Sequence, residues 1–185
     1  MIVSLCLVLT FGMYGISHSG ESNMNPEDPV IAMAFPKLEA KTLSGEKIVY
    51  PDSVKGKVTL LVLAFERQTQ DKVDSWLGPF MGQFAEEDRA RFYEIPMLAG
   101  KWKLLSGIID GGMRRGVPGD RHDHVSTFYG DVDRYCEQLQ IGDKSDGYVF
   151  LLDRDGVIRW RSNGWATEEK LQALFEKTRT LMKMR

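Results

Sequence analysis

The chain has 185 residues, of which 43% are hydrophobic and 27% are charged, so it can bury the core of one domain of ordinary size. Its formal net charge of −2 gives no reason to expect a nucleic-acid partner, because phosphate binding needs a clear basic excess. The two cysteines, Cys6 and Cys136, form no CxxC motif and lack the spacing of a zinc knuckle, and we expect no bound metal.

The N-terminus is nearly all apolar up to residue 16, and the first basic side chain is Lys37. This run is shorter than the roughly 20 residues of a membrane-spanning helix, and it fits the hydrophobic region of a secretory signal. We predict a signal peptide over residues 1–19, with a retained N-terminal membrane anchor as the alternative. Either one implies a protein that is exported to the periplasm, or anchored in the membrane and facing the periplasm. Residues 20–34 are polar and contain proline, which predicts a linker before a domain over 35–185.

The first half of this domain alternates predicted strands and helices. After a short strand at 47–50, residues 58–65 (V-T-L-L-V-L-A-F) form the strongest predicted strand, an apolar run typical of a central strand buried on both faces. A helix is predicted over 69–88 and a strand over 91–98. A second helix is predicted over 101–113, and we expect four of its residues to face inward: Leu104, Leu105, Ile108 and Ile109.

The second half ends in a hairpin and a helix. The apolar run 148–152 predicts a buried strand, and the Asp-Arg-Asp-Gly turn at 153–156 leads into an alternating strand at 157–161. Thr167 is the predicted cap of the last helix. Between the two halves we expect a polar loop over 114–123, a strand over 125–129 and a helix over 131–139. The alternation predicts an α/β fold with a mixed central sheet flanked by helices.

Three motifs in this order resemble the thioredoxin superfamily, in its peroxiredoxin and membrane-anchored reductase branches. They are F-P-K-L-E-A-K-T-L-S-G-E from residue 35, G-K-V-T-L-L-V-L from residue 56 and F-L-L-D-R-D-G-V-I-R from residue 150. The resemblance implies a thioredoxin-like three-layer fold. Redox members carry the active cysteine just after the strong strand, where a helix N-terminus lowers the pKa of the thiol. Residues 65–70 here read F-E-R-Q-T-Q, and Asp146-Gly147 stands where the superfamily has its cis-proline.

A narrower resemblance covers roughly residues 35–180. It rests on Y-E-I-P from residue 93, I-D-G-G-M-R from 109, G-Y-V-F-L-L-D from 147, I-R-W from 158 and G-x-A from 164. Together these motifs are similar to the mitochondrial ATP-synthase assembly factors that chaperone the membrane-embedded proton-channel subunit, which are thioredoxin-like without the redox pair. A mitochondrial presequence is rich in arginine and residues 1–36 contain none, so we expect a bacterial or archaeal exported relative whose client can differ.

The best candidate binding segment runs from Asp110 to Arg121, predicted to be a glycine-rich loop. It holds Gly111 and Gly112 together with three arginines, Arg114, Arg115 and Arg121. Arginine forks pair with carboxylates, and exposed glycine N–H groups add to an anion site. The alternative is a solvated connection between two elements.

Other candidates lie elsewhere in the chain. Glu66 and Arg67 occupy the position of the redox cysteine and are predicted either to retain a partner-binding surface or to be plain polar surface. Trp160 and Trp165 could form an aromatic contact patch, although Trp160 could equally pack under the last helix. Cys136 falls on the apolar side of its helix, which predicts a small buried hydrophobe.

We therefore predict a non-enzymatic protein that binds another protein in an assembly or chaperone role, with a membrane complex such as ATP synthase as a candidate client. No Ser-His-Asp order, phosphate loop or paired-carboxylate signature stands out, and no cofactor is expected. The alternative is a thiol–disulfide or peroxide oxidoreductase that works through Cys136 alone. A third hypothesis is a binder of small anions at the three arginines.

Overall fold

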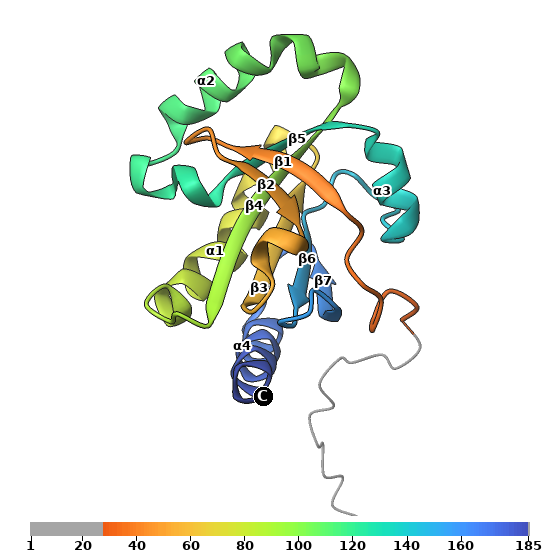
Figure 1. The fold of residues 1–185 in the computed structure, drawn as a ribbon. Helices are drawn as coiled ribbons and strands as arrows, with labels where there is room; N and C mark the ends of the chain where they lie inside the picture. Colours follow the sequence, from red (N-terminus) through yellow and green to blue (C-terminus); the bar gives the residue numbers. More distant parts are fainter. Residues whose placement is uncertain (1–27, 185) are drawn as a thin grey trace, which may run out of the picture.

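A computed structural model describes residues 28–184 (Figure 1). The predicted signal peptide or anchor and the first part of the predicted linker lie outside the described residues. Within the described part, no helix is both long and apolar enough to cross a bilayer.

One mixed sheet of seven strands forms the centre of the domain, in the order β2-β1-β5-β4-β3-β6-β7. Strand β3 pairs in parallel with β4 and antiparallel with β6, and each of its seven residues is buried. This confirms the prediction that residues 58–65, the strongest predicted strand, form a central strand covered on both faces. The strands are β1 (Leu38–Thr42), β2 (Lys47–Tyr50), β3 (Val58–Ala64), β4 (Ala90–Ala99), β5 (Ser126–Gly130), β6 (Tyr148–Leu152) and β7 (Ile158–Asn163).

Helices cover both faces of the sheet and make the three layers that were predicted (Figure 1). On one face, α1 (Gln70–Phe84) and α4 (Glu168–Lys183) bury Trp76, Phe80 and Phe175 against alternate residues of the central strands. On the other face, α3 (Val132–Gln138) and the N-terminal strands cover the second hydrophobic cluster. The α/β fold class is confirmed.

The C-terminal hairpin forms as its sequence predicts. The Asp153 carboxylate accepts hydrogen bonds from the backbone N–H groups of Asp155 and Val157, at 2.9 and 3.0 Å. Gly156 has a φ of +82°, and a β-carbon there would lie 2.4 Å from Pro51, so only glycine fits this turn. Thr167 caps α4 by accepting a hydrogen bond from the N–H of Lys170.

The domain begins before the predicted boundary at residue 35. Val30 is fully buried, and the backbone of 32–33 exchanges two 2.8 Å hydrogen bonds with Ile158 of β7. The carboxylate of Asp28 forms an ion pair with Arg161, with 2.6 Å between Oδ2 and Nε. Residues 28–34 were predicted to be part of a polar, proline-bearing linker over 20–34, but they pair with the edge of the sheet, and this part of the prediction is wrong.

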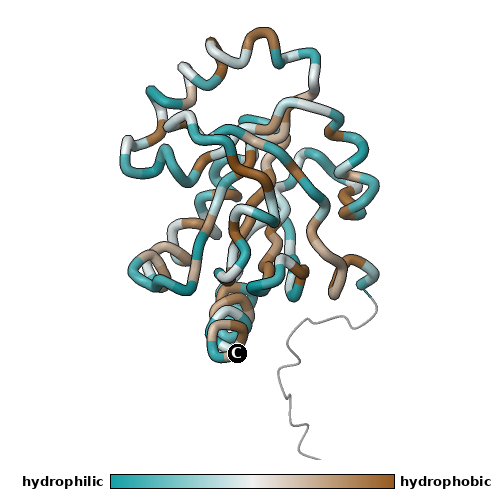
Figure 2. The backbone as a smooth tube through the Cα atoms, viewed as in Figure 1, coloured by the Kyte–Doolittle hydropathy of each residue, from teal (hydrophilic) through white to brown (hydrophobic). Residues whose placement is uncertain are grey.

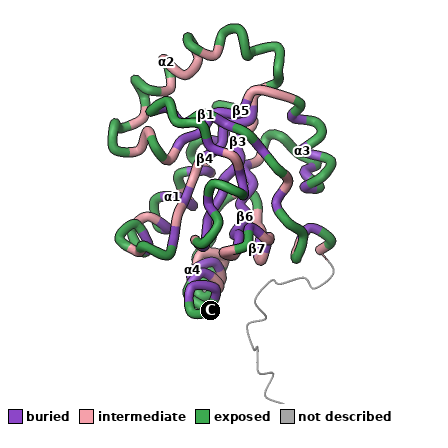
Figure 3. Tube along the Cα trace, viewed as in Figure 1, coloured by how far each residue is buried: buried purple, intermediate pink, exposed green. Residues whose placement is uncertain are grey.

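The prediction for the second helix is wrong in its extent and in its inward face. A 3₁₀ helix, η3 (Gly100–Leu105), leads into α2 (Ser106–Gly116), and neither element contains a buried residue. Figure 2 shows hydrophobic residues along this segment, and Figure 3 shows that the same segment is exposed or only partly buried. Leu104, Leu105 and Ile108 are therefore exposed, and the predicted inward face does not pack on the core.

Candidate functional site

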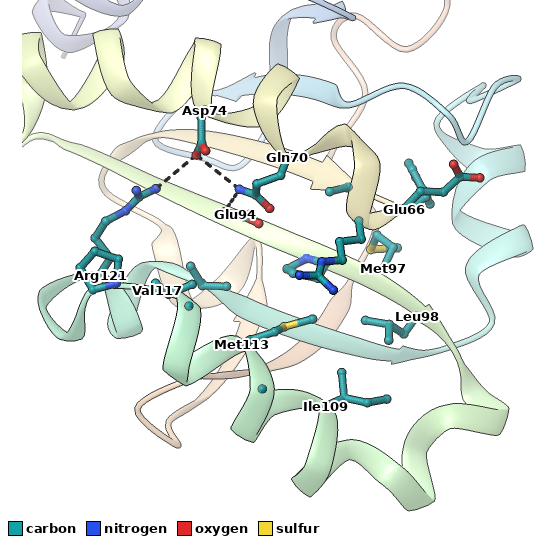
Figure 4. Close-up of a pocket in the computed structure, with 18 residues that line it drawn as sticks. Glu66, Gln70, Asp74, Glu94, Met97, Leu98, Ile109, Met113, Val117 and Arg121 are labelled. Carbon is teal, nitrogen blue, oxygen red and sulfur yellow. Dashed lines mark hydrogen bonds and ion pairs between the residues drawn. The ribbon is translucent and has the colours of Figure 1, made fainter.

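A pocket of about 870 Å³ lies between the start of α1 and the inner side of α2 (Figure 4). One wall is the turn after β3, continued by the 3₁₀ helix η2 (Arg67–Thr69) and the first turn of α1. Strand β4 contributes Glu94, Pro96, Met97 and Leu98. The opposite wall is α2 with η4 (Gly119–His124). This volume lies in the range of ligand pockets in proteins, about 300–1,000 Å³.

The pocket is mostly apolar. Ile109, Gly112, Met113 and Gly116 line it, a spacing of i, i+3, i+4 and i+7 that places them on one face of α2. Met97 faces the same space from β4, so two methionines contribute to the lining. Methionine side chains are flexible and polarisable, and they adapt to irregular apolar partners. This surface suits an apolar segment of a partner better than a rigid small molecule.

A small polar group lies at one end of the pocket. The Gln70 amide nitrogen donates to the carboxylates of Asp74 and Glu94, at 3.3 and 3.4 Å. Arg121 pairs with Asp74 at 3.9 Å, as Figure 4 shows. The buried Nε–H of Arg121 finds no acceptor among the described residues.

Glu94 is the unusual member of this group. Its side chain is buried within the hydrophobic strand β4, and burial raises the pKa of its carboxyl above the ordinary value, with the charge of Asp74 acting in the same direction. The hydrogen bond from Gln70 and the charge of Arg121 only partly offset this rise in the pKa. Glu94 can thus present a protonated carboxyl to the pocket more readily than a surface glutamate can.

Two separately predicted regions meet in this pocket. Glu66 and Arg67 line it from the former redox position, and Gly112 and Arg121 line it from the glycine-rich segment. Nothing in the order of residues indicated that these two regions, which are far apart in the chain, face each other.

The glycine-rich segment is not the predicted loop. Its first part is helical to Gly116, and its last part belongs to η4. The tertiary contacts of α2 explain this: Asp110 accepts a 2.8 Å hydrogen bond from the Tyr129 hydroxyl, and Arg114 donates to the Leu43 carbonyl at 3.0 Å. These contacts tie α2 to β5 and to the end of β1, despite the low helix propensity of glycine.

The three arginines do not form one anion site. Arg114 is engaged with Leu43, Arg121 lines the pocket, and Arg115 is exposed outside the pocket. Asp110 and Gly111 also lie outside the pocket lining. A helix distributes neighbouring side chains around its axis, whereas the prediction placed them in one loop.

The predicted tryptophan patch does not form either. Trp160 is buried and packs edge-to-face on Trp76, with ring centroids 5.8 Å apart. Trp165 is exposed, and it lies outside the pocket lining. Trp160 thus belongs to the core cluster that α1 and α4 share, and it is not part of a surface patch.

Sequence reasoning missed Gln70, Asp74 and Glu94 as pocket residues. One signal was available for Glu94: an acidic residue inside the predicted buried strand 91–98 needs a structural or functional reason. Gln70 and Asp74 carry no local signal, because a polar residue near the start of a helix is ordinary surface unless another element covers it.

Cys136 is buried on α3 and does not line the pocket. Burial raises the pKa of its thiol, which disfavours the reactive thiolate. The prediction of a small buried hydrophobe is confirmed. At the redox position, the segment after β3 holds Glu66 and Arg67 on the surface, beside Gln68.

Comparison with known proteins gives a family and a fold. The model of the family described as ATP10 protein matches residues 30–181. A search among curated proteins gives no match. Among solved structures, BsSco, a member of the Sco family of cytochrome c oxidase assembly proteins, has a TM-score of 0.58 and 11% identity, covering 82% of this chain and 95% of that one.

Two further structures carry the same fold. Yeast Sco1 with copper bound has a TM-score of 0.56 at 13% identity, over 85% of this chain and 96% of that one. The thioredoxin domain of a thiol-disulfide oxidoreductase from Bacteroides vulgatus has a TM-score of 0.54 at 14% identity, over 80% and 97%. These likenesses confirm the thioredoxin-like fold.

Proposed function

Because the chain belongs to the ATP10 protein family, we propose that it is an assembly factor that binds a membrane subunit of ATP synthase and performs no thiol chemistry. The pocket between α1 and α2 is the proposed binding site. Its occupant is an apolar segment of the client with at least one polar group.

The observation that carries the proposal is the position of the pocket. It opens beside the turn after β3, where redox members of the superfamily place the reactive cysteine, and here that turn carries Glu66 and Arg67. The position that carries the reactive cysteine in redox members therefore lines an apolar pocket in this chain. A fold can keep a partner-binding surface while its catalytic residues change.

The lining supports a membrane-protein client. Segments that enter a bilayer are apolar and expose large aliphatic side chains before assembly. Met97, Ile109 and Met113 can accommodate such side chains, while Glu94 and Arg121 place one carboxyl and one guanidinium group in the lining. A buried polar group in the client would then find a partner instead of remaining unsatisfied.

Crosslinking mass spectrometry of the full chain in its native membranes tests the proposal. We expect crosslinks to membrane subunits of ATP synthase, and we expect Met113→Lys to abolish them, because a lysine in the apolar lining must be desolvated on binding. Met184→Lys is the matched control, since Met184 is exposed after α4 and lies outside the pocket. Equal crosslinks in the two variants would refute the pocket, and crosslinks to other membrane proteins alone would refute the client.

The oxidoreductase alternative has a separate test. If the chain turned over a disulfide or peroxide substrate, Cys136→Ser would abolish the activity. Under our proposal the wild type shows no such turnover, because the Cys136 thiol is buried and away from the pocket.

We also propose that the protein is exported, from the apolar sequence of residues 2–16. N-terminal sequencing of the mature protein tests this. A start at residue 20 supports a cleaved signal, an intact N-terminus in the membrane fraction supports an anchor, and an intact N-terminus in the cytoplasmic fraction contradicts export.

A further inference from the structure

The segment from Gly100 to Gly116 has two apolar faces, and only one of them belongs to the pocket. The inner face, with Ile109 and Met113, lines the pocket. The other, which we call the outer face, includes the most exposed leucine and the most exposed isoleucine of the described chain. It consists of Trp102 (44% exposed), Leu104 (96%), Leu105 (45%) and Ile108 (74%).

Such a surface requires an explanation. A helix in a protein gains most of its stability from burying an apolar stripe, but η3 and α2 contain no buried residue. Contiguous exposed apolar side chains on a folded domain typically mark a surface that is covered by something else. The pocket does not provide this cover, because none of the four outer-face residues lines it.

The charges around the outer face indicate what covers it. Residues 100–116 carry four basic side chains and one acidic side chain, although the whole chain has a net charge of −2. Lys101 and Lys103 alternate with Trp102 and Leu104, and the Lys101 ammonium lies 5.6 Å from the Trp102 ring centroid. Arg115 follows Ile108 by seven residues and so lies on the same side of α2. The single acid, Asp110, is already bonded to Tyr129.

From these observations we infer that the outer face docks onto the surface of an anionic lipid bilayer. Aliphatic and tryptophan side chains flanked by lysine and arginine are the pattern of helices that lie in the membrane interface. Tryptophan favours the headgroup level, where its ring is buried and its N–H stays hydrated. Docking of this kind would hold the pocket at the membrane surface, beside apolar segments of membrane proteins.

Quenching of tryptophan fluorescence by brominated lipid tests the inference on the full chain. The probe is a vesicle of equal parts phosphatidylglycerol and brominated phosphatidylcholine. Trp76 and Trp160 are buried in the core, so only Trp102 and Trp165 can meet the lipid. Quenching requires contact within the bilayer, so it reports the position of Trp102 whatever else attaches the chain to the vesicle.

We expect the wild type to be quenched, Trp102→Phe to lose most of the quenching, and Trp165→Phe to keep it. Lys101→Gln with Lys103→Gln should weaken docking about 25-fold, which is about fivefold for each lysine near an anionic surface. Met113→Lys should leave the quenching in place, so this inference and the proposed client pocket can fail separately.

Two results would overturn the inference. One is quenching that survives Trp102→Phe. The other is the absence of quenching on lipid vesicles together with a photocrosslink from position 104 to a protein in native membranes, which would assign the outer face to a protein instead.

Discussion

The glycines of α2 allow a quantitative test of the helical wall of the pocket. Gly111 and Gly112 are helical, and a β-carbon added at either position would meet nothing within 4 Å. Replacing glycine by alanine in a helix interior stabilises the helix by about 1 kcal/mol for each residue. The double variant Gly111→Ala/Gly112→Ala should therefore stabilise α2 by about 2 kcal/mol, which lowers its local opening constant about 25-fold.

Amide hydrogen exchange measures this opening directly. Because α2 has no buried residue, we expect its amides to exchange by local opening and those of β3 to exchange only on global unfolding. The double variant should slow exchange in α2 by the factor of about 25 that the opening constant gives.

Two control variants isolate the effect. Gly82→Ala makes the same change in α1, again without steric conflict, and should leave α2 exchange unchanged. Gly156→Ala should destabilise the whole domain by about 2 kcal/mol or more, because a φ of +82° and the close contact with Pro51 both oppose a side chain. Unchanged exchange in α2 of the double variant would refute the assignment of residues 106–116 as a helix that opens locally.

Three further predictions concern buried side chains. The pKa of Glu94 is raised from its ordinary value of 4.5, so its contribution to stability is fully present below that value and is lost as the pH rises through the raised pKa. In urea unfolding, the free energy of unfolding of Glu94→Gln should match that of the wild type near pH 4 and exceed it at neutral pH. Parallel pH profiles of the two proteins would contradict this. Trp160→Ala should lower the free energy of unfolding by about 3–5 kcal/mol, and a loss below about 1 kcal/mol would contradict the packing of Trp160 against Trp76. In a Cys6→Ser background, Cys136 should react with a thiol reagent at least about tenfold more slowly in the native state than in denaturant. Equal reaction rates in the two states would contradict its burial.

The predictions that the structure confirms depend on local patterns. The run V-T-L-L-V-L-A-F became the central strand β3, the Asp153–Gly156 turn closed the β6–β7 hairpin, and Thr167 capped α4. In each case neighbouring residues provide both the signal and the interaction, so no knowledge of the rest of the fold is needed.

The predictions that were wrong depended on which distant part of the chain packs against a segment. Spacing placed Leu104, Leu105 and Ile108 on a helix, but periodicity gives only the relative positions of side chains around an axis, and the sheet decides which side is covered. Residues 28–34 were assigned to the linker together with the polar residues before them, although 30–34 (V-I-A-M-A) are apolar, and only the structure shows that they pair with β7. The glycine-rich composition of the α2 segment indicated a loop, because the hydrogen bonds that hold this helix to the sheet join distant parts of the chain. The bond from Arg114 to Leu43, for example, joins residues that are 71 positions apart.

The order of residues alone was enough to establish the fold class and the absence of a cysteine after β3, because strand patterning and a missing nucleophile are visible in it. The packing of distant segments was needed to establish that Glu66 and Arg121 line the same pocket, that Glu94 is buried at its edge, and that α2 presents a second apolar face to the outside. Burial and proximity arise only when such segments come together, and the pKa of a carboxyl or the exposure of a leucine follows from that packing.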